Sequence, residues 1–323
     1  MIVRGDSVAA YCCAHLLNKA GFRIDVEHLD RPRLPVILLG DQALALIREI
    51  FDRPGLFHNA PRIRRRVAAW GHEAKPVSLE HSAVMVSEQM LLDAIRPSVG
   101  GAGHRDATWT ILATRPLPEL TDQHAFGSRS ASVAPVTLQA TSPVETCWIE
   151  SLDEGWLFLT PDWLLSVGAS ADVLLAQSRV VVSQIADFRP SQGTFPAYAR
   201  ITWPLAGAGW LACGSAAMAF DPICGDGTAH AIREAILASA VLRGIANGGS
   251  TQELLSHYQM RLTAGFQRHL MLCRQFYESG GRARFWRSEL AAIDRGIEWC
   301  GNQMARHTGF RYQLRGFELE AVR

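Results

Sequence analysis

The first thirty residues constrain the fold more than any other part of the chain. Ile2 and Val3 form a short apolar strand, a turn follows at residues 5–7, and residues 8–18 carry small and apolar side chains at helical spacing. Gly21 ends this helix, and residues 24–26 have the character of a second strand. This β-turn-α-β order predicts a unit in which a tight turn and a helix amino terminus can receive a pyrophosphate.

The glycine pattern of such a turn is degraded in this chain. Its three positions fall on Gly5, Ser7 and Ala10, so only the first is glycine, although the other two residues are small enough for close backbone approach. From these residues alone a dinucleotide-binding unit and an ordinary βαβ unit both remain open. The residue expected to contact a ribose at the end of the second strand is Glu27, or His28 if the register is counted from Gly21.

The amino-acid composition excludes several classes of protein for this chain. Of the 323 residues, 48% are hydrophobic and 20% charged, which excludes a mostly disordered chain. The formal net charge of +1 gives no general attraction to nucleic acid or to an anionic membrane, and no apolar run reaches the roughly 18 residues of a spanning helix. The seven cysteines form no CxxC pair, so we expect reduced thiols, no metal site and a cytoplasmic protein.

The rest of the chain divides into a region of strands and a region of helices. Residues 84–95 carry apolar side chains at helical spacing, residues 99–103 form a glycine-rich loop, and residues 106–114 resemble a buried strand. Short β-branched or aromatic runs follow at residues 131–139, 146–151 and 155–160. Helical patterns follow at residues 229–246, 251–266, 267–277 and 285–300.

The stretch from residue 210 to 236 is the most informative for chemistry. An apolar strand leads into Gly214-Ser215, a short connection reaches Asp221-Pro222, and Gly225-Asp226-Gly227 opens an alanine-rich helix. Such a helix start exposes unpaired backbone N–H groups and a positive dipole end, which suit negative charge on a ring system or a phosphate. A purely structural turn could also require two glycines.

This stretch resembles the second flavin motif of the FAD-dependent monooxygenases and halogenases with the p-hydroxybenzoate-hydroxylase fold. Gly214-Ser215-Ala216-Ala217 stands where that family has Gly-Asp-Ala-Ala, and Asp-Pro and Gly-x-Gly follow at Asp221-Pro222 and Gly225-Asp226-Gly227. The resemblance implies that the chain binds FAD. It places Ser215 at the ribityl chain, where a hydroxyl is a weaker anchor than the usual carboxylate.

Further motifs resemble the tryptophan-halogenase-like branch. They are Trp156, Phe158 and Pro161 of a relaxed Trp-x-Trp-x-Ile-Pro box, the turn Trp70-Gly71, and the pairs Phe276-Tyr277 and Phe285-Trp286. In the interval where halogenases place a functional lysine the chain has only Lys75, and Glu88 stands where the branch commonly has a flavin-contacting arginine. The pattern is most similar to the flavoproteins that oxygenate a peptidyl tryptophan during tryptophylquinone maturation.

The resemblance implies an α/β (α+β) fold, with a Rossmann-like three-layer FAD-binding domain, an inserted and mostly antiparallel substrate-binding sheet, and carboxy-terminal helices. We place the FAD-binding domain at residues 1–116 and 201–246, the substrate sheet at 117–200, and the helical region at 247–323. For this fold the chain is short, so we also expect an open substrate face.

The implied activity is hydroxylation of an electron-rich aromatic substrate through a flavin C4a-hydroperoxide. The substrate could be part of a polypeptide, and the lack of a nicotinamide-binding segment suggests a separate flavin reductase as partner. The alternatives are a flavin-dependent halogenase, or a non-catalytic maturation or binding partner that keeps the fold but binds FAD weakly. A nicotinamide dehydrogenase would leave residues 210–236 without a role.

Candidate functional residues follow from these motifs. The cofactor-binding candidates are Gly5, Ser7, Ala10, Glu27, His28, Gly214, Ser215, Asp221, Pro222, Gly225, Asp226 and Gly227. The catalytic candidates are His72, His124, Arg129, Asp226 and His230, and the substrate-side candidates are Trp70, Trp156 and Phe158. Each also has a structural interpretation, such as core packing or, for Asp226, helix capping. For Cys224, beside the flavin turn, an inert buried thiol is favoured over a redox-active one.

Overall fold

The computed structural model describes residues 1–72, 74–97, 108–190, 193–306 and 311–322. The glycine-rich loop predicted at residues 99–103 lies outside the described residues. The α-helices are α1 (Val8–Lys19), α2 (Asp41–Ile50), α3 (Glu88–Ile95), α4 (Ala171–Gln177), α5 (Gly227–Ala246), α6 (Thr251–Gly280) and α7 (Arg284–Met304). Short 3-10 helices lie at η1 (Val182–Gln184), η2 (Gly214–Ala216) and η3 (Pro222–Cys224).

The amino-terminal strands form a five-stranded, mostly parallel sheet. Its order is β15 (Ala206–Gly207), β16 (Trp210–Ala212), β6 (Thr110–Leu112), β1 (Ile2–Arg4) and β2 (Asp25–Glu27). The strands β16, β6, β1 and β2 pair in parallel, and only β15 is antiparallel to its neighbour. The predicted β-turn-α-β opening is therefore present, and the strand before Gly214 lies two strands away from β1 in the same sheet.

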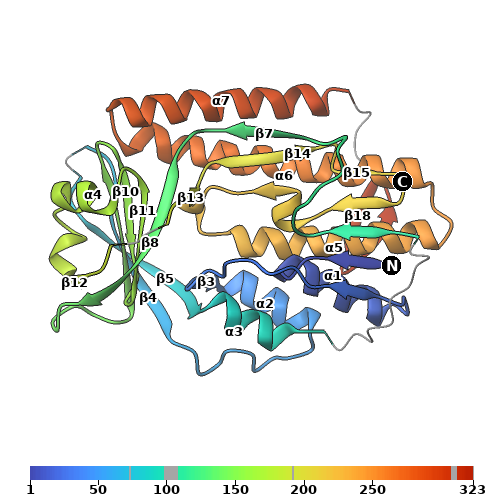
Figure 1. Cartoon of the computed structure of the whole chain (residues 1–323), viewed down its shortest axis with the longest axis horizontal. Helices are drawn as coiled ribbons and strands as arrows, with labels where there is room; N and C mark the ends of the chain where they lie inside the picture. The colour runs from blue at the N-terminus through green and yellow to red at the C-terminus, as the bar shows by residue number, and fades with distance from the viewer. Residues whose placement is uncertain (73, 98–107, 191–192, 307–310, 323) are drawn as a thin grey trace.

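A larger sheet occupies one end of the molecule (Figure 1). Its order is β12 (Ile185–Phe188), β8 (Ser130–Leu138), β11 (Trp163–Gly168), β10 (Gly155–Leu159), β9 (Thr146–Leu152), β4 (Arg62–Ala69), β5 (Val77–Val86) and β3 (Ile37–Gly40), and β13 (Phe195–Pro196) also pairs with β8. The pairings are antiparallel except for β4 with β9. Strands from residues 37–86 thus join those from residues 130–196.

The two sheets are connected by a third sheet and covered by helices. The third sheet has the order β17 (Met218–Ala219), β14 (Ala199–Trp203) and β7 (Asp122–Phe126). The long helices α6 and α7 pack on each other along one edge of the molecule, and α5 packs between α1 and α6 (Figure 1). After α7 the chain forms a hairpin, β18 (Tyr312–Arg315) with β19 (Glu318–Ala321), which the sequence pattern did not indicate.

Two predicted helical segments are corrected by the structure. The helical spacing at residues 84–95 is wrong for its first part, because β5 continues to Val86 and pairs there with β3. The hydroxyl of Ser87 then accepts the N–H of Met90 and starts α3. The two helical stretches predicted at 251–266 and 267–277 form the single helix α6, because no proline or turn separates them.

The main core lies where the five-stranded sheet, α1, α5 and α6 meet. Its largest fully buried side chains include Tyr11, Tyr258 and Phe266, and Trp156 and Trp286 extend it toward the large sheet. Among the described residues, none of the helices combines the length and apolarity that a membrane crossing requires.

Candidate functional site

The first candidate turn connects β1 to α1. Gly5 has a φ of 122°, and a Cβ there would lie 2.7 Å from Thr114 Oγ1, so only glycine fits. Ser7 Oγ accepts the N–H of Ala10 at 3.2 Å and caps α1, and Ala10 is fully buried beneath it. The three positions of the degraded glycine pattern therefore serve as turn, cap and packing surface. The tight turn with a positive φ at Gly5 is present although the second and third glycines are replaced.

Two arginines that the sequence analysis did not select lie over this turn. Arg31 Nε and Arg33 Nη1 donate to the carbonyl oxygen of Asp6 at 3.2 and 2.6 Å, and Arg33 also pairs with the Asp6 carboxylate. Burial raises the pKa of Asp6, but the nearby Tyr11 hydroxyl and the hydrogen bond and charge of Arg33 outweigh burial and lower it. The available signal was the Arg31-Pro-Arg33 run, which is separated from the second strand by three residues.

Glu88 belongs to the same group of charges. It is buried in the first turn of α3, pairs with Arg31 and accepts the N–H of Leu34 at 2.9 Å. The resemblance described above implies an arginine at position 88, where this chain has glutamate. In the structure Arg31, from the loop after β2, places a guanidinium beside Glu88.

The two ribose candidates lie at the end of β2. Glu27 is half-exposed and pairs with Arg4 at 2.7 Å, and His28 Nδ1 lies 3.9 Å from Asp6 Oδ1. Both side chains are near the first turn, so either could contact a ribose bound there.

The second candidate turn approaches the first one closely. Gly214 has a φ of 57°, and a Cβ on it would lie 2.7 Å from the Cβ of Ala9 in α1. Ser215 is exposed, and its hydroxyl donates to the carbonyl of Ala113 at 3.2 Å. Residues 5–10 and 214–215, which are more than 200 positions apart in sequence, therefore lie against each other.

A buried acid supports the second turn. Glu234, on α5, accepts the N–H of Gly214 at 2.7 Å, and its other carboxyl oxygen, Oε1, has no partner among the described residues. Burial raises the pKa of Glu234 to about 8, although the bond from Gly214 opposes the shift. Near neutral pH this side chain is therefore largely a neutral acid.

The raised pKa of Glu234 predicts a pH dependence of stability. Between the ordinary value of 4.5 and about 8, the unfolded chain loses a proton that the folded chain keeps, so this group lowers the free energy of unfolding as pH rises. Glu234→Gln keeps the acceptor for Gly214 and should become more stable relative to wild type between about pH 5 and pH 8. Urea unfolding at both pH values measures this, with exposed Glu145→Gln as control. Parallel profiles for wild type and Glu234→Gln would contradict the assignment.

The third candidate turn leads into α5. Asp221 is buried, caps the N–H of Ile223, and donates its own N–H to His269 Nε2 at 2.9 Å. Gly225 has a φ of 66°, and a Cβ at Gly225 or Gly227 would meet no atom within 4 Å. Open space therefore faces the two glycines on the side where a side chain would project.

Asp226 is the N-cap residue of α5, yet its side chain makes no capping hydrogen bond. Its Oδ2 lies 3.0 Å from His230 Nε2, and its Oδ1 lies 3.9 Å from His269 Nδ1. Burial raises the pKa of Asp226, but the hydrogen bond and charge of His230 outweigh it, so the net shift is downward. The helix-capping interpretation is thus replaced by a carboxylate–histidine pair beside an uncapped helix start.

The remaining catalytic candidates are dispersed. Arg129 is buried and pairs with both Asp221 and Glu289, with its guanidinium 4.7 Å from the ring centre of Tyr277. His124 packs against Trp299 at 4.6 Å between ring centres, and His72 is exposed after β4. Of the five candidates, the described contacts bring Arg129, Asp226 and His230 to the third turn.

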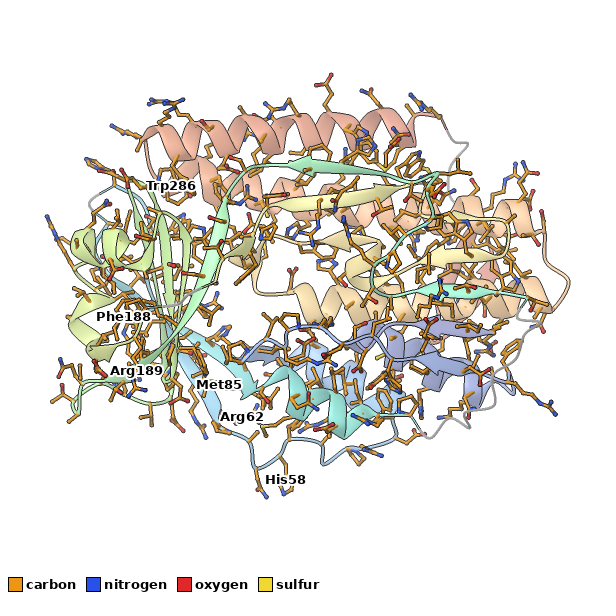
Figure 2. The ribbon with its side chains drawn as sticks, viewed as in Figure 1. His58, Arg62, Met85, Phe188, Arg189 and Trp286 are labelled. Atoms are coloured by element: carbon orange, nitrogen blue, oxygen red, sulfur yellow. The ribbon has the colours of Figure 1, made fainter. Side chains whose placement is uncertain are left out.

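The tryptophan motifs form a packed cluster between the large sheet and the helices. Trp70 contacts Trp156 and Trp286 at 6.4 and 5.5 Å between ring centres. Trp286, labelled where α7 begins in Figure 2, donates its indole N–H to the carbonyl of Leu152 at 2.8 Å. Trp156 donates to Tyr277 Oη at 3.4 Å, and Phe158 lies under Arg66. The contacts of this cluster join the sheet to α6 and α7.

Two side-chain groups at the third turn have metal-ligand character. Cys224, His269 and Cys273 form one, and Asp226, His230 and His269 form the other, each with ligand-type atoms within 4.8 Å of one another. In the first group His269 Nε2 already accepts the N–H of Asp221. We therefore assign no metal to the cysteines.

Neither a protein-family model nor a curated protein matches the sequence. Solved structures do. The peptidyl tryptophan dihydroxylase QhpG, essential for tryptophylquinone cofactor biogenesis, is 18% identical, with a TM-score of 0.71 over 99% of this chain and 85% of that one. CmlS, a flavin-dependent halogenase, is 15% identical, with a TM-score of 0.73 over 94% and 70% of the two chains.

The chain has the fold of the FAD-dependent monooxygenases and halogenases. A third example, pqsL, a probable FAD-dependent monooxygenase from Pseudomonas aeruginosa, is 11% identical and has a TM-score of 0.59 over 93% of this chain and 98% of that one. The predicted fold class is confirmed, and so is the predicted resemblance at the level of the fold. In this fold the first candidate turn lies more than 200 positions before the second and third turns, which follow each other closely in the chain.

Proposed function

We propose that the chain is an FAD-dependent monooxygenase. The observation that carries the proposal is the third turn, where Gly225 and Gly227 face open space and α5 begins without a side-chain cap. A planar group fits against two glycines, and uncapped N–H groups at a helix start stabilise negative charge on it. The flavoprotein fold supports the same proposal.

The three turns divide the binding of FAD among them. The turn from Gly5 to Ser7, with Ala10 packed beneath it, would hold the pyrophosphate at the start of α1, with Glu27 or His28 at the ribose. Gly214 and Ser215 would lie along the ribityl chain. Residues 221–227, including Asp221 and Pro222, would support the isoalloxazine ring, and Arg31 and Arg33 would compensate phosphate charge.

Bound FAD would supply the redox chemistry that activates oxygen. The chain itself provides proton handling beside that site. With the Nε2 proton of His230 directed at the Asp226 carboxylate, its Nδ1 carries the lone pair and can accept a proton from an indole or phenol. Phe220 stacks on His230 at 4.0 Å between ring centres and fixes the orientation of the imidazole.

For the substrate we propose an electron-rich aromatic ring, with tryptophan in a polypeptide as the preferred form. The likeness to QhpG, which extends over 99% of this chain, supports this choice. Lys75 is exposed in the connection between β4 and β5, which favours hydroxylation over halogenation. A separate reductase would deliver the electrons.

A coupled assay tests the activity. The protein, FAD, a flavin reductase and NADH are incubated with a tryptophan-containing peptide, with free tryptophan, and with each of these plus halide. Added oxygen in the peptide product supports the proposal, whereas a halogenated product would establish the halogenase instead. Weak or absent FAD binding, without any product on either substrate, would favour the non-catalytic partner.

The arginines over the first turn give a prediction about affinity. Arg33→Ala leaves the Asp6 carboxylate without its cation where the pyrophosphate would lie, and should weaken FAD binding by about tenfold, or about 1.4 kcal/mol. Adding Asp6→Asn should restore part of the loss, because it removes the repelling charge. Fluorescence titration measures both, with the surface variant Arg64→Ala as control. Unchanged affinity in Arg33→Ala would contradict the placement of the pyrophosphate.

A further inference from the structure

A pair of cysteines links the third turn to α6. Cys224, in η3, and Cys273, in α6, have their sulfur atoms 3.6 Å apart. Cys224 is partly exposed, whereas Cys273 is fully buried. Cys224 is therefore the member of the pair nearer to solvent, and the buried Cys273 sulfur lies in contact with it.

The surroundings give the two thiols different reactivity. A hydrogen bond from Cys273, aided by His269, lowers the pKa of Cys224 to about 7 in spite of burial. Burial raises the pKa of Cys273, which also lies 3.3 Å from His269 Nε2. The thiol of the partly exposed Cys224 is thus the one that forms a thiolate near neutral pH, and thiolates are the reactive form.

The same chain contains a second pair for comparison. Cys13 and Cys213 have sulfur atoms 3.9 Å apart, but both side chains are fully buried. A hydrogen bond from Cys13 and burial raise the pKa of Cys213 well above its ordinary value. Proximity of sulfurs is common to both pairs, but the first pair has a partly exposed member, whereas both members of the second are buried.

We propose that Cys224 and Cys273 are a peroxide-reactive pair that closes to a disulfide between the third turn and α6. The Cys224 thiolate attacks hydrogen peroxide, forming an S–O bond, breaking the O–O bond and releasing hydroxide. Cys273 sulfur then attacks the sulfenic acid, the S–O bond breaks, and the Cys273 proton leaves with the second hydroxide as water. In total two thiols and one peroxide give one disulfide and two waters.

This inference goes beyond the proposed function and does not depend on it. It also reverses the sequence-based preference for an inert Cys224, because the sequence did not show that Cys273, 49 positions later, lies behind it. Zinc binding would be an alternative use of the two sulfurs. The hydrogen bond from the Asp221 N–H to His269 Nε2 favours the free pair, since it occupies the lone pair that a third ligand would need.

The test treats the full-length, fully reduced protein with a small excess of hydrogen peroxide at neutral pH. We expect loss of two of the seven thiols, a Cys224–Cys273 cross-link in non-reducing peptide mapping, and recovery with dithiothreitol. The rate should rise as pH passes through about 7. In Cys273→Ser the sulfenic acid on Cys224 has no second thiol to react with, so it should accumulate and be trapped as a dimedone adduct. Cys224→Ser should retain all of its remaining thiols.

The Cys13–Cys213 pair in the same sample serves as an internal control and should remain reduced. Any of three results would overturn the proposal. The first is retention of all seven thiols. The second is a Cys13–Cys213 cross-link that forms in preference to the Cys224–Cys273 cross-link. The third is stoichiometric zinc in the purified protein that protects Cys224 and Cys273 from oxidation. None of these results depends on FAD binding or on oxygenase activity, so the two proposals fail separately.

Discussion

Replacing Arg129 with methionine should lower the free energy of unfolding by about 3–5 kcal/mol, because two buried carboxylates lose their common cation. Asp221 and Glu289 both pair with Arg129, and all three side chains are nearly or fully buried. Burial lowers the pKa of Arg129, but the charges around it, Asp221 first, outweigh burial and raise it, so it stays charged. Urea unfolding measures the effect.

Two further variants separate this mechanism from simple loss of packing. Arg64→Met removes an exposed pair with Glu145 and should cost less than about 1 kcal/mol. Adding Asp221→Asn and Glu289→Gln to Arg129→Met should recover part of the loss, since the unpaired charges are then removed. An Arg129→Met protein as stable as wild type would show that the ion pairs do not hold the third turn to β8 and α7.

Replacing Gly227 with leucine should weaken FAD binding by at least about 100-fold, or about 2.8 kcal/mol, so that binding is no longer measurable, while the fold is kept. The new side chain enters the open space where we place the isoalloxazine ring. Gly227 lies in α5 without a positive φ, and leucine is a better helix former than glycine by up to about 1 kcal/mol, so stability should not fall.

The matched control is Gly301→Leu. Gly301 is a glycine of α7 whose Cβ would meet only the flexible end of Gln267 at 3.7 Å, and α7 contributes nothing to the proposed flavin surface. The substitution should leave FAD affinity unchanged. If Gly227→Leu bound FAD as tightly as wild type, the flavin ring would have to lie away from the third turn.

Local signals in the sequence predicted much of the fold. The first strand, turn and helix follow from Gly5, the Ser7 cap and the apolar spacing up to Leu17, all of which act within a few residues. The third turn is equally local, since Asp221 caps Ile223 and the backbone at Gly225 requires a positive φ. Such features depend on neighbouring residues and can be read without tertiary structure.

The roles of several residues could not be predicted from the sequence, because they depend on long-range contacts. Arg129 is 92 positions from Asp221 and 160 from Glu289, so nothing local distinguishes it from a catalytic arginine. Asp226 has the sequence of a helix cap, but the position of His230 one turn later draws its carboxylate away. The tryptophan motifs indicated the correct fold, and their contacts are those of a packed core between sheet and helices.

Titration of FAD into the purified wild-type protein tests the central claim most directly. We expect saturable binding at one site, with quenched flavin fluorescence and a resolved visible absorption band. Binding should be weakened in Arg33→Ala and lost in Gly227→Leu. Folded wild-type protein that leaves the flavin spectrum and fluorescence unchanged at saturating FAD would contradict the claim.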